Sequence, residues 1–181
     1  MRRKIPNREL HRLTPQAFKE SPRLPVVLVL DNVRSRHNIG SAFRTSDAFA
    51  LEHVYLCGIT SCPPSPEIHK SALGAEDTME WTYTKQTVDA VRTLQAEGYK
   101  VWAVEQTEGA EKLSSLTSKD WPVTQKTAFV FGHEVRGVQQ EVVNLCDGCI
   151  EIPQHGTKHS LNVSVAIGVV LWHVYLTMRV W

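Results

Sequence analysis

The stretch that decides the fold is VVLVLDNVRSRHNIGSAFRTSDAF, residues 26–49. It opens with five aliphatic residues, and an apolar run of this length without polar alternation is typical of a strand buried on both faces of a parallel sheet. Residues 38–50 then have the pattern of a helix. Arg44 stands in this helix among mostly small and apolar residues. We therefore expect its guanidinium to be buried against a specific partner.

The same alternation continues along the chain. Strand-length apolar runs occur at 53–58, 99–105, 127–132 and 148–153, and helical patterns at 86–97, 138–145 and 160–178. Strands separated by helices indicate a sheet covered on both sides. The sequence therefore predicts the α/β class, with a mostly parallel sheet flanked by helices. The proline-rich 61–67 is expected to be a loop.

The segment 160–178 has no charged residue and approaches the length of a membrane span. A span would leave several polar side chains facing lipid, and the sequence has no second segment of this kind. We therefore predict no membrane association and a helix buried in the core or in a dimer interface. Ser164 and Gly168 lie four residues apart, a spacing that lets another backbone approach closely.

Composition sets bounds on the class of protein. A chain of 181 residues with 42% hydrophobic residues and a net charge of +1 fits one compact domain, and its charge alone names no partner. Residues 1–24 form a basic arm that precedes a predicted domain at 25–181. The arm could contact phosphates or be a solvated end, and its basic residues are Arg2, Arg3, Lys4, Arg8 and Arg12. It has no signal-peptide core, which predicts a cytoplasmic protein.

The four cysteines do not indicate a metal site. Cys57 ends a predicted strand, Cys62 precedes two prolines, and Cys146 and Cys149 flank a turn. Buried or incidental thiols in a reducing compartment explain these positions better than zinc.

In parallel sheets ligands bind at the carboxyl ends of the strands, so the loops after 105, 131 and 152 are the place to look for a site. None contains the dinucleotide fingerprint, and the Gly132/Gly137 pair lacks the lysine and hydroxyl residue of a phosphate loop. These loops do offer glycines, hydroxyls, amides and one acid. Such a set suits a neutral or zwitterionic ligand with an adenine and a ribose.

Each polar candidate also has a purely structural interpretation. Arg44 could form a buried ion pair with Asp47 or Asp31, or could bind a phosphate. Glu134 could simply be an acid near the start of a helix. Ser160 could be the N-cap of the last helix, with Asn162 in its first turn.

Three motifs occur in order along the chain: N-x-G-x-x-x-R-T from residue 38, F-G-x-E from 131 and I-P-x-x-G-x-x-x-S-L-N-V-S-V-A from 152. Together they resemble the motifs of the SpoU-type, TrmH-like RNA ribose 2′-O-methyltransferases of the SPOUT superfamily, over roughly residues 25–178. KSALGAE, residues 70–76, also looks like a segment of this family. The resemblance implies a deep C-terminal trefoil knot, S-adenosylmethionine as cofactor, a homodimer that completes the active site, and no metal.

The resemblance also assigns roles to residues. Arg44 is similar to the family's catalytic arginine, and its implied partners in catalysis are Asn38, Glu134, Ser160 and Asn162. The implied cofactor pocket is formed by Thr107, Gly132, Ile152 and Leu161. For the arginine two roles stay open: a base activated by its surroundings, or a cation that binds phosphate and stabilises a developing alkoxide.

The short stretch before the first strand resembles compact transfer-RNA enzymes that methylate a loop guanosine, so transfer RNA is the expected substrate. Ribosomal RNA is the alternative within the same class. A non-catalytic RNA-binding module would be expected to have lost the polar residues, all of which are present. A small-molecule-binding domain would leave the basic arm unexplained.

Overall fold

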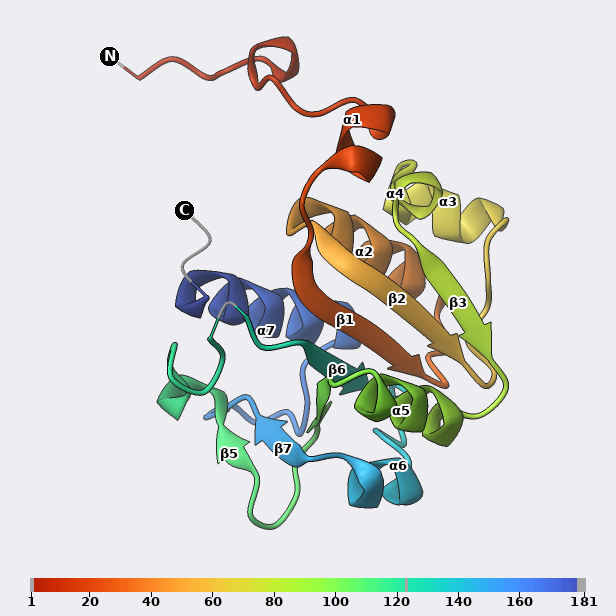
Figure 1. Cartoon of the computed structure of the whole chain (residues 1–181), viewed down its shortest axis with the longest axis vertical. Coiled ribbons are helices and arrows are strands. Elements are labelled where there is room, and N and C mark those ends of the chain that lie inside the picture. The colour runs from red at the N-terminus through yellow and green to blue at the C-terminus, as the bar shows by residue number, and fades with distance from the viewer. Residues whose placement is uncertain (1, 123, 179–181) are drawn as a thin grey trace.

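The computed structural model describes residues 2–122 and 124–178. Its centre is a parallel sheet with strand order β3-β2-β1-β6-β4-β7-β5 (Figure 1). The strands are β1 (Leu24–Asp31), β2 (Leu51–Cys57), β3 (Trp81–Thr84), β4 (Lys100–Val104), β5 (Glu111–Lys112), β6 (Thr127–Phe131) and β7 (Gly148–Glu151). All pairings between these strands are parallel, which confirms the predicted class.

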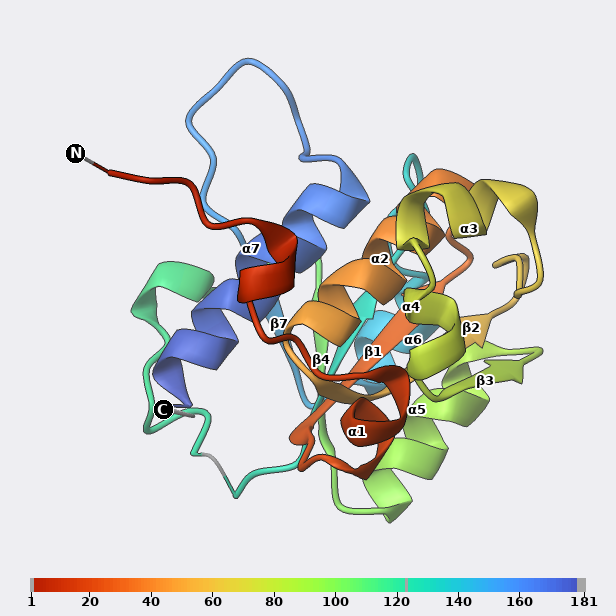
Figure 2. The same ribbon diagram turned by 90° about the horizontal axis from the view of Figure 1, so that it is seen from above.

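Helices cover both faces of the sheet. They are α1 (Pro15–Glu20), α2 (Arg36–Ala48), α3 (Pro66–Ala72), α4 (Ala75–Thr78), α5 (Thr87–Ala96), α6 (Gln140–Leu145) and α7 (Val163–Thr177), with single 3₁₀ turns at Asn7–Glu9 and Leu113–Ser115. Figure 2 shows α2 and α7 side by side on one face, and Figure 1 shows α5 and α6 on the other.

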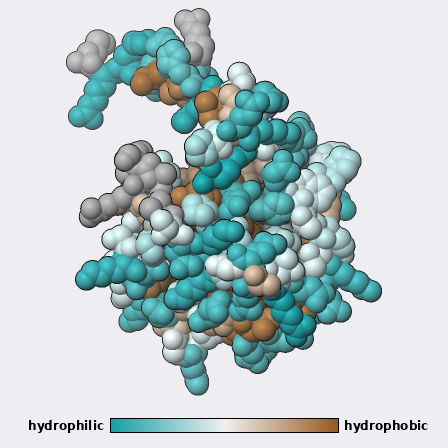
Figure 3. Space-filling model, in the orientation of Figure 1, coloured by the Kyte–Doolittle hydropathy of each residue, from teal (hydrophilic) through white to brown (hydrophobic). Residues whose placement is uncertain are grey.

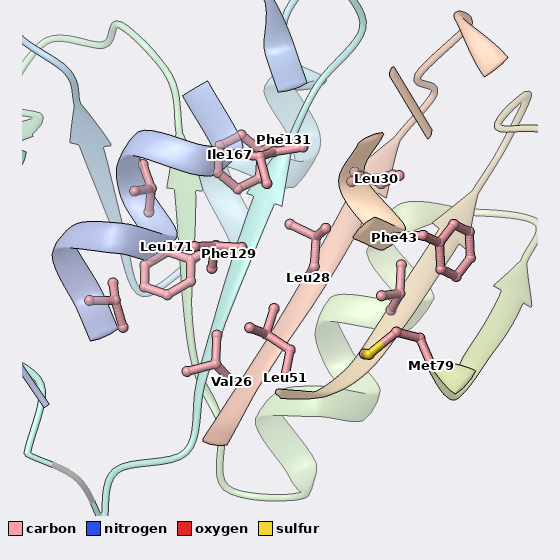
Figure 4. Close-up of a cluster of buried hydrophobic side chains, with 14 of the residues drawn as sticks. Val26, Leu28, Leu30, Phe43, Leu51, Met79, Phe129, Phe131, Ile167 and Leu171 are labelled. Atoms are coloured by element: carbon pink, nitrogen blue, oxygen red, sulfur yellow. The ribbon is translucent and has the colours of Figure 1, made fainter. Parts of the chain in front are cut away.

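Strand β1 supplies both layers of the core, because alternate side chains of a strand point to opposite faces. Val26, Leu28 and Leu30 pack against α2 and α7 through Phe43, Ile167 and Leu171 (Figure 4). Val27 and Val29 pack against α5 and α6. This double burial explains why 26–30 carries no polar residue.

Several boundaries and elements differ from the prediction. Helix α7 begins at Val163 instead of 160, and α3 begins at Pro66, inside the stretch expected to be a loop. Pro66 is tolerated because the first residue of a helix needs no backbone donor. Strand β3 was missed because it is short and partly exposed, and β5 because it has only two residues.

Helix α7 is apolar around most of its circumference. One side is buried through Ile167, Val170, Leu171 and Val174, whereas Val165, Val169, Trp172 and Leu176 are exposed on it. In the described ranges, 2–122 and 124–178, no helix is long and apolar enough to cross a membrane.

The N-terminal segment is in two parts. Helix α1 is capped by Thr14, which accepts a hydrogen bond from the Ala17 amide, and its Phe18 joins the core beneath the guanidinium of Arg23. Residues 2–13 extend away from the body in Figure 1, and in the view from above they pass in front of α7 (Figure 2). Figure 3 shows apolar residues on this extension, where Ile5, Leu10 and Leu13 are exposed, against a largely hydrophilic body surface.

Candidate active site

A cleft of about 490 Å³ opens at the carboxyl ends of β4, β6 and β7, the edge at which the sequence predicted a site. The loops after all three strands line it, and so does the start of α7. All four residues predicted to bind the cofactor lie in its wall, together with two of the five predicted catalytic residues: Thr107, Gly132, Ile152, Leu161, Glu134 and Ser160.

The Glu134 carboxylate fastens the loop before α2 to the loop after β6. Its oxygens accept hydrogen bonds from the Ser35 amide at 2.8 Å, the Arg34 amide at 3.0 Å and Nδ2 of Asn38 at 3.0 Å. Burial by itself raises the pKa of this carboxyl, but these hydrogen bonds outweigh it and the pKa lies below its ordinary value. Glu134 is therefore an ionised acceptor at neutral pH.

Asn38 and Asn162 extend this hydrogen-bonded chain to α7. Nδ2 of Asn162 donates to Oδ1 of Asn38 at 3.3 Å, while Oδ1 of Asn162 accepts from the Ser164 amide at 2.9 Å. Asn162 is thus the N-cap of α7, and the alternative structural interpretation of Ser160 as the cap is wrong. Ser160 is an exposed residue of the cleft, because α7 begins three residues later than expected.

The sequence-based reasoning missed Glu105. Its carboxylate follows β4 and accepts hydrogen bonds from the Val138 amide at 2.9 Å and the Gln106 amide at 2.8 Å. It also lies against Gly137, where an added Cβ would come within 2.0 Å of Oε2. A glutamate at the end of one strand and glycines after a later strand were the available signal, but the sequence alone does not show that β4 and β6 are neighbours in the sheet.

The loop 132–138 is a tight hairpin. His133 and Gly137 exchange two backbone hydrogen bonds of 3.0 and 2.8 Å, and Gly137 has φ +67°, a conformation that favours glycine. A Cβ on Gly132 would lie 2.0 Å from the carbonyl carbon of Gly137. Both glycines are therefore required by the close return of the backbone.

The cleft fits a nucleoside-sized ligand with a polar tail. Its volume is within the usual range for small-molecule sites, and its wall combines the apolar Val104, Ile150 and Ile152 with carboxylate and amide groups. Nε2 of Gln106 donates to the His159 carbonyl at 2.7 Å and so ties the loop after β4 to the loop before α7. These residues could hold an adenosyl group between the loops.

Arg44 is not part of this cleft. It is exposed, and no ion pair joins it to Asp31 or Asp47, so both the predicted burial and the ion-pair interpretation are wrong. Asp31 instead accepts hydrogen bonds from Asn32, Thr87 and Gln139, and Asp47 accepts one from Thr78.

Arg44 also lies at a distance from the first residue of its motif. It follows Asn38 by six positions on α2, which is about 9 Å along the helix axis and about 240° around it. Arg44 lines a second hollow beside α1 and α4.

The described part of the chain contains no group of three or more His, Cys, Asp or Glu side chains that could hold a metal ion. The four cysteines are free. Burial raises the pKa of the Cys57 and Cys146 thiols to about 12, which keeps both protonated at neutral pH.

The geometry agrees with comparisons to known proteins. Residues 25–172 match the SpoU rRNA Methylase family. The chain belongs to this family. Membership confirms the resemblance drawn from the three motifs. The second and third motifs, 131–134 and 152–166, contribute to the wall of the cleft, and the first, 38–45, lies on α2 and is hydrogen-bonded to both.

Two curated SpoU relatives are RNA methyltransferases. The 23S rRNA (guanosine-2′-O-)-methyltransferase RlmB of Vibrio cholerae is 36% identical over 148 residues, which are 82% of this chain and 58% of that protein. RlmB of Haemophilus ducreyi is 31% identical over 94% of this chain and 67% of that protein. The chain thus spans 58% to 67% of the length of these two relatives.

Solved SpoU structures have the same fold. An AdoMet-bound rRNA methyltransferase from Sinorhizobium meliloti aligns with a TM-score of 0.76 and 25% identity, covering 87% of this chain and 59% of that one. A TrmH/SpoU tRNA modifying enzyme from A. aeolicus gives a TM-score of 0.77 at 23% identity, covering 90% and 81%.

Proposed function

We propose that this chain is an S-adenosylmethionine-dependent RNA ribose 2′-O-methyltransferase. The observation that carries the proposal is the hydrogen-bonded chain Glu134–Asn38–Asn162, which joins the three SpoU motifs at the rim of one nucleoside-sized cleft. Relatives above 30% identity are named as guanosine-2′-O-methyltransferases, which supports a guanosine ribose as the target.

In this proposal the cofactor is held by the loops after β4, β6 and β7, with Thr107, Gly132, Ile152 and Leu161 in contact with it. When bound, S-adenosylmethionine supplies a methyl group already activated by its sulfonium. The protein's contribution is to align the ribose with that methyl and to assist the loss of the hydroxyl proton. A site with these tasks needs no metal.

The acid of the second motif has a positioning role in this scheme. Glu134 is ionised and accepts three hydrogen bonds, so its role in this scheme is to hold the N-terminal end of α2 and Asn38 in place. Ser160 presents a hydroxyl to the cleft, and Asn162, the N-cap of α7, is hydrogen-bonded to Asn38 and to the Ser164 amide.

Arg44 is proposed to act as a cation, because arginine side chains stay protonated at neutral pH and hold phosphates well. Within one chain it lines a different hollow from the cofactor cleft. We therefore infer that Arg44 of one protomer serves the cleft of its partner in a homodimer. The exposed apolar side chains of α7 support such a dimer, since α7 starts at the cleft and carries Val165, Val169, Trp172 and Leu176 on its surface.

Two further parts of the proposal concern the chain path and the arm. The position of β6 between β1 and β4, with β7 beyond β4, supports the trefoil knot implied by family membership. Residues 1–24 are proposed to be an RNA-binding arm attached to a methyltransferase domain at 25–181.

Ribosomal RNA is the first substrate to test, because both relatives named above act on 23S rRNA. Transfer RNA is the second, as the sequence suggested. The test is transfer of labelled methyl from S-adenosylmethionine to unmodified 23S rRNA transcripts and, separately, to transfer RNA, with the product mapped by mass spectrometry. A 2′-O-methylated nucleotide in either RNA would support the proposal. Calorimetry that detects no cofactor binding would instead favour a non-catalytic RNA-binding module.

A further inference from the structure

The second hollow, of about 590 Å³, contains cations from two segments that are far apart in the sequence. Arg44 comes from α2 and Lys19 from α1, and both side chains are exposed. The rest of the wall includes the uncharged Pro15, Gln16, Ala72, Leu73, Gly74 and Ala75. A Cβ built on Gly74 would meet nothing within 4 Å, so this part of the wall is open.

Neither cation has a hydrogen-bond or ion-pair partner among the described residues. Two acids also line the hollow. The Asp47 carboxylate is occupied by the Thr78 hydroxyl at 2.7 Å, and Asp77 stands exposed on α4. The two cations and the two carboxylates of the wall balance in formal charge, because the hydrogen bond from Thr78 leaves the Asp47 carboxylate ionised. The ammonium and guanidinium groups have no acceptor among the described residues, so both can donate charge-assisted hydrogen bonds to an incoming phosphate.

Lys19 is held in place by the fold of α1. Thr14 caps the helix, and the neighbouring Phe18 is buried in the core under Arg23. The backbone that carries Lys19 is therefore held against the body of the protein, as the backbone of Arg44 is in α2. Two cationic side chains on helices that line one hollow can together select the position of an anion.

We propose that Lys19 and Arg44 together form a phosphate-binding subsite for the RNA strand that carries the target ribose. This inference rests on the proposed function, in which Arg44 contacts the same nucleotide. Lys19 is a positioning residue in it: Lys19 binds a backbone phosphate and does not touch the reacting atoms. Helix α1 thereby becomes part of the substrate site.

The test compares Lys19→Ala with Lys112→Ala, an exposed lysine on β5 at the far edge of the sheet. Anisotropy with a fluorescent RNA transcript, measured over a series of KCl concentrations, gives the affinity and its salt slope. Loss of one phosphate contact should weaken binding by roughly threefold to tenfold and reduce the salt slope by about one, without sequence preference. Lys19→Arg should restore most of the affinity, and Lys112→Ala should match the parent protein.

Methyl transfer separates this subsite from the proposed function. Lys19→Ala should raise KM for RNA while kcat and cofactor affinity remain unchanged, whereas Arg44→Ala should lower kcat. A Lys19→Ala variant that transfers methyl groups with an unchanged KM and salt slope would overturn the subsite and leave the methyltransferase intact. If the parent protein transfers no methyl group but its RNA affinity still depends on Lys19, the result would support the phosphate subsite and refute the proposed methyltransferase activity. A fall in dimer stability in Lys19→Ala, measured by analytical ultracentrifugation, would overturn the subsite in favour of a protein contact.

Discussion

Nδ2 of Asn38 donates a hydrogen bond to Glu134 at 3.0 Å, although 96 residues separate the two in the sequence. The same carboxylate takes the amide protons of Arg34 and Ser35, so one side chain fixes both the loop before α2 and the first turn of that helix. The acid of the second motif is therefore a structural anchor for the first motif.

Replacement of this anchor should damage both stability and activity. In Glu134→Gln an NH₂ group would face one of the backbone donors, leaving it unsatisfied at a cost of about 1–3 kcal/mol in the free energy of unfolding. We expect methyl transfer to fall by at least about tenfold because Asn38 loses its fixed position. Urea unfolding and initial rates measure the two effects. Glu141→Gln, on α6, is the matched control and should change neither.

The same carboxylate predicts a pH dependence. The pKa of Glu134 is lower in the folded protein than its ordinary value of 4.5, so its stabilising contribution is fully present above that value. The contribution is lost as the pH falls through the lower folded pKa. The difference in unfolding free energy between the parent and Glu134→Gln should therefore be constant from pH 7 to 5.5 and shrink below about pH 4.5. A difference that stays constant down to pH 3 would contradict this.

The hairpin 132–138 predicts a glycine-specific defect in cofactor binding. Gly137→Ala places a Cβ within 2.0 Å of the Glu105 carboxylate, in addition to the strain of its positive φ. Gly109→Ala has the same kind of strain, with φ +79°, and no atom within 4 Å of the new Cβ. Only Gly137→Ala should weaken binding of S-adenosylhomocysteine by at least about tenfold. Calorimetry measures this, and equal affinities in the two variants would mean that the Glu105 contact does not shape the cleft.

The exposed side of α7 predicts an interface whose loss abolishes activity. Trp172 is 48% exposed and forms an aromatic group with Phe49 and Tyr175. Trp172→Asp should convert a dimer into monomers in analytical ultracentrifugation, because a charge would have to be desolvated at the interface. The control is Ile59→Asp, at a side chain that is 61% exposed away from α7. A Trp172→Asp protein that remains dimeric would place the interface elsewhere.

Mixed dimers test whether Arg44 acts across the interface. Arg44→Ala keeps an intact cleft, and Gly137→Ala keeps an intact arginine. If the arginine serves its partner, mixing and re-associating the two impaired variants, with cofactor too dilute to occupy the Gly137→Ala cleft, should give about a quarter of the parent rate, because half of the dimers carry one complete site. If the arginine serves its own chain, no mixture contains a complete site and the rate stays at the residual level of the two variants.

The sequence predicted the sheet and the cleft because both depend on local patterns. Unbroken aliphatic runs such as 26–30 mark buried strands, and the family motifs brought Glu134, Asn38 and Asn162 to attention. The exposure of Arg44 could not be predicted from local pattern, since it depends on how α1 and α4 pack beside α2. Glu105 was missed for a similar reason: its contact with the other loop is to the backbone amide of Val138, and a sequence pattern does not show which backbone amide a side chain will meet.

The contacts that define the site also determine when it can exist. Asn162 meets Asn38 across 124 residues and Glu134 meets Asn38 across 96, so no local segment contains even one of these bonds. During synthesis the hydrogen bonds of the first motif cannot form until the second and third motifs have left the ribosome. Loop closure over such distances is slow, and the cleft should be the last region to gain protection from hydrogen exchange during refolding. A nascent chain would thus be unable to bind the cofactor before its sheet is complete.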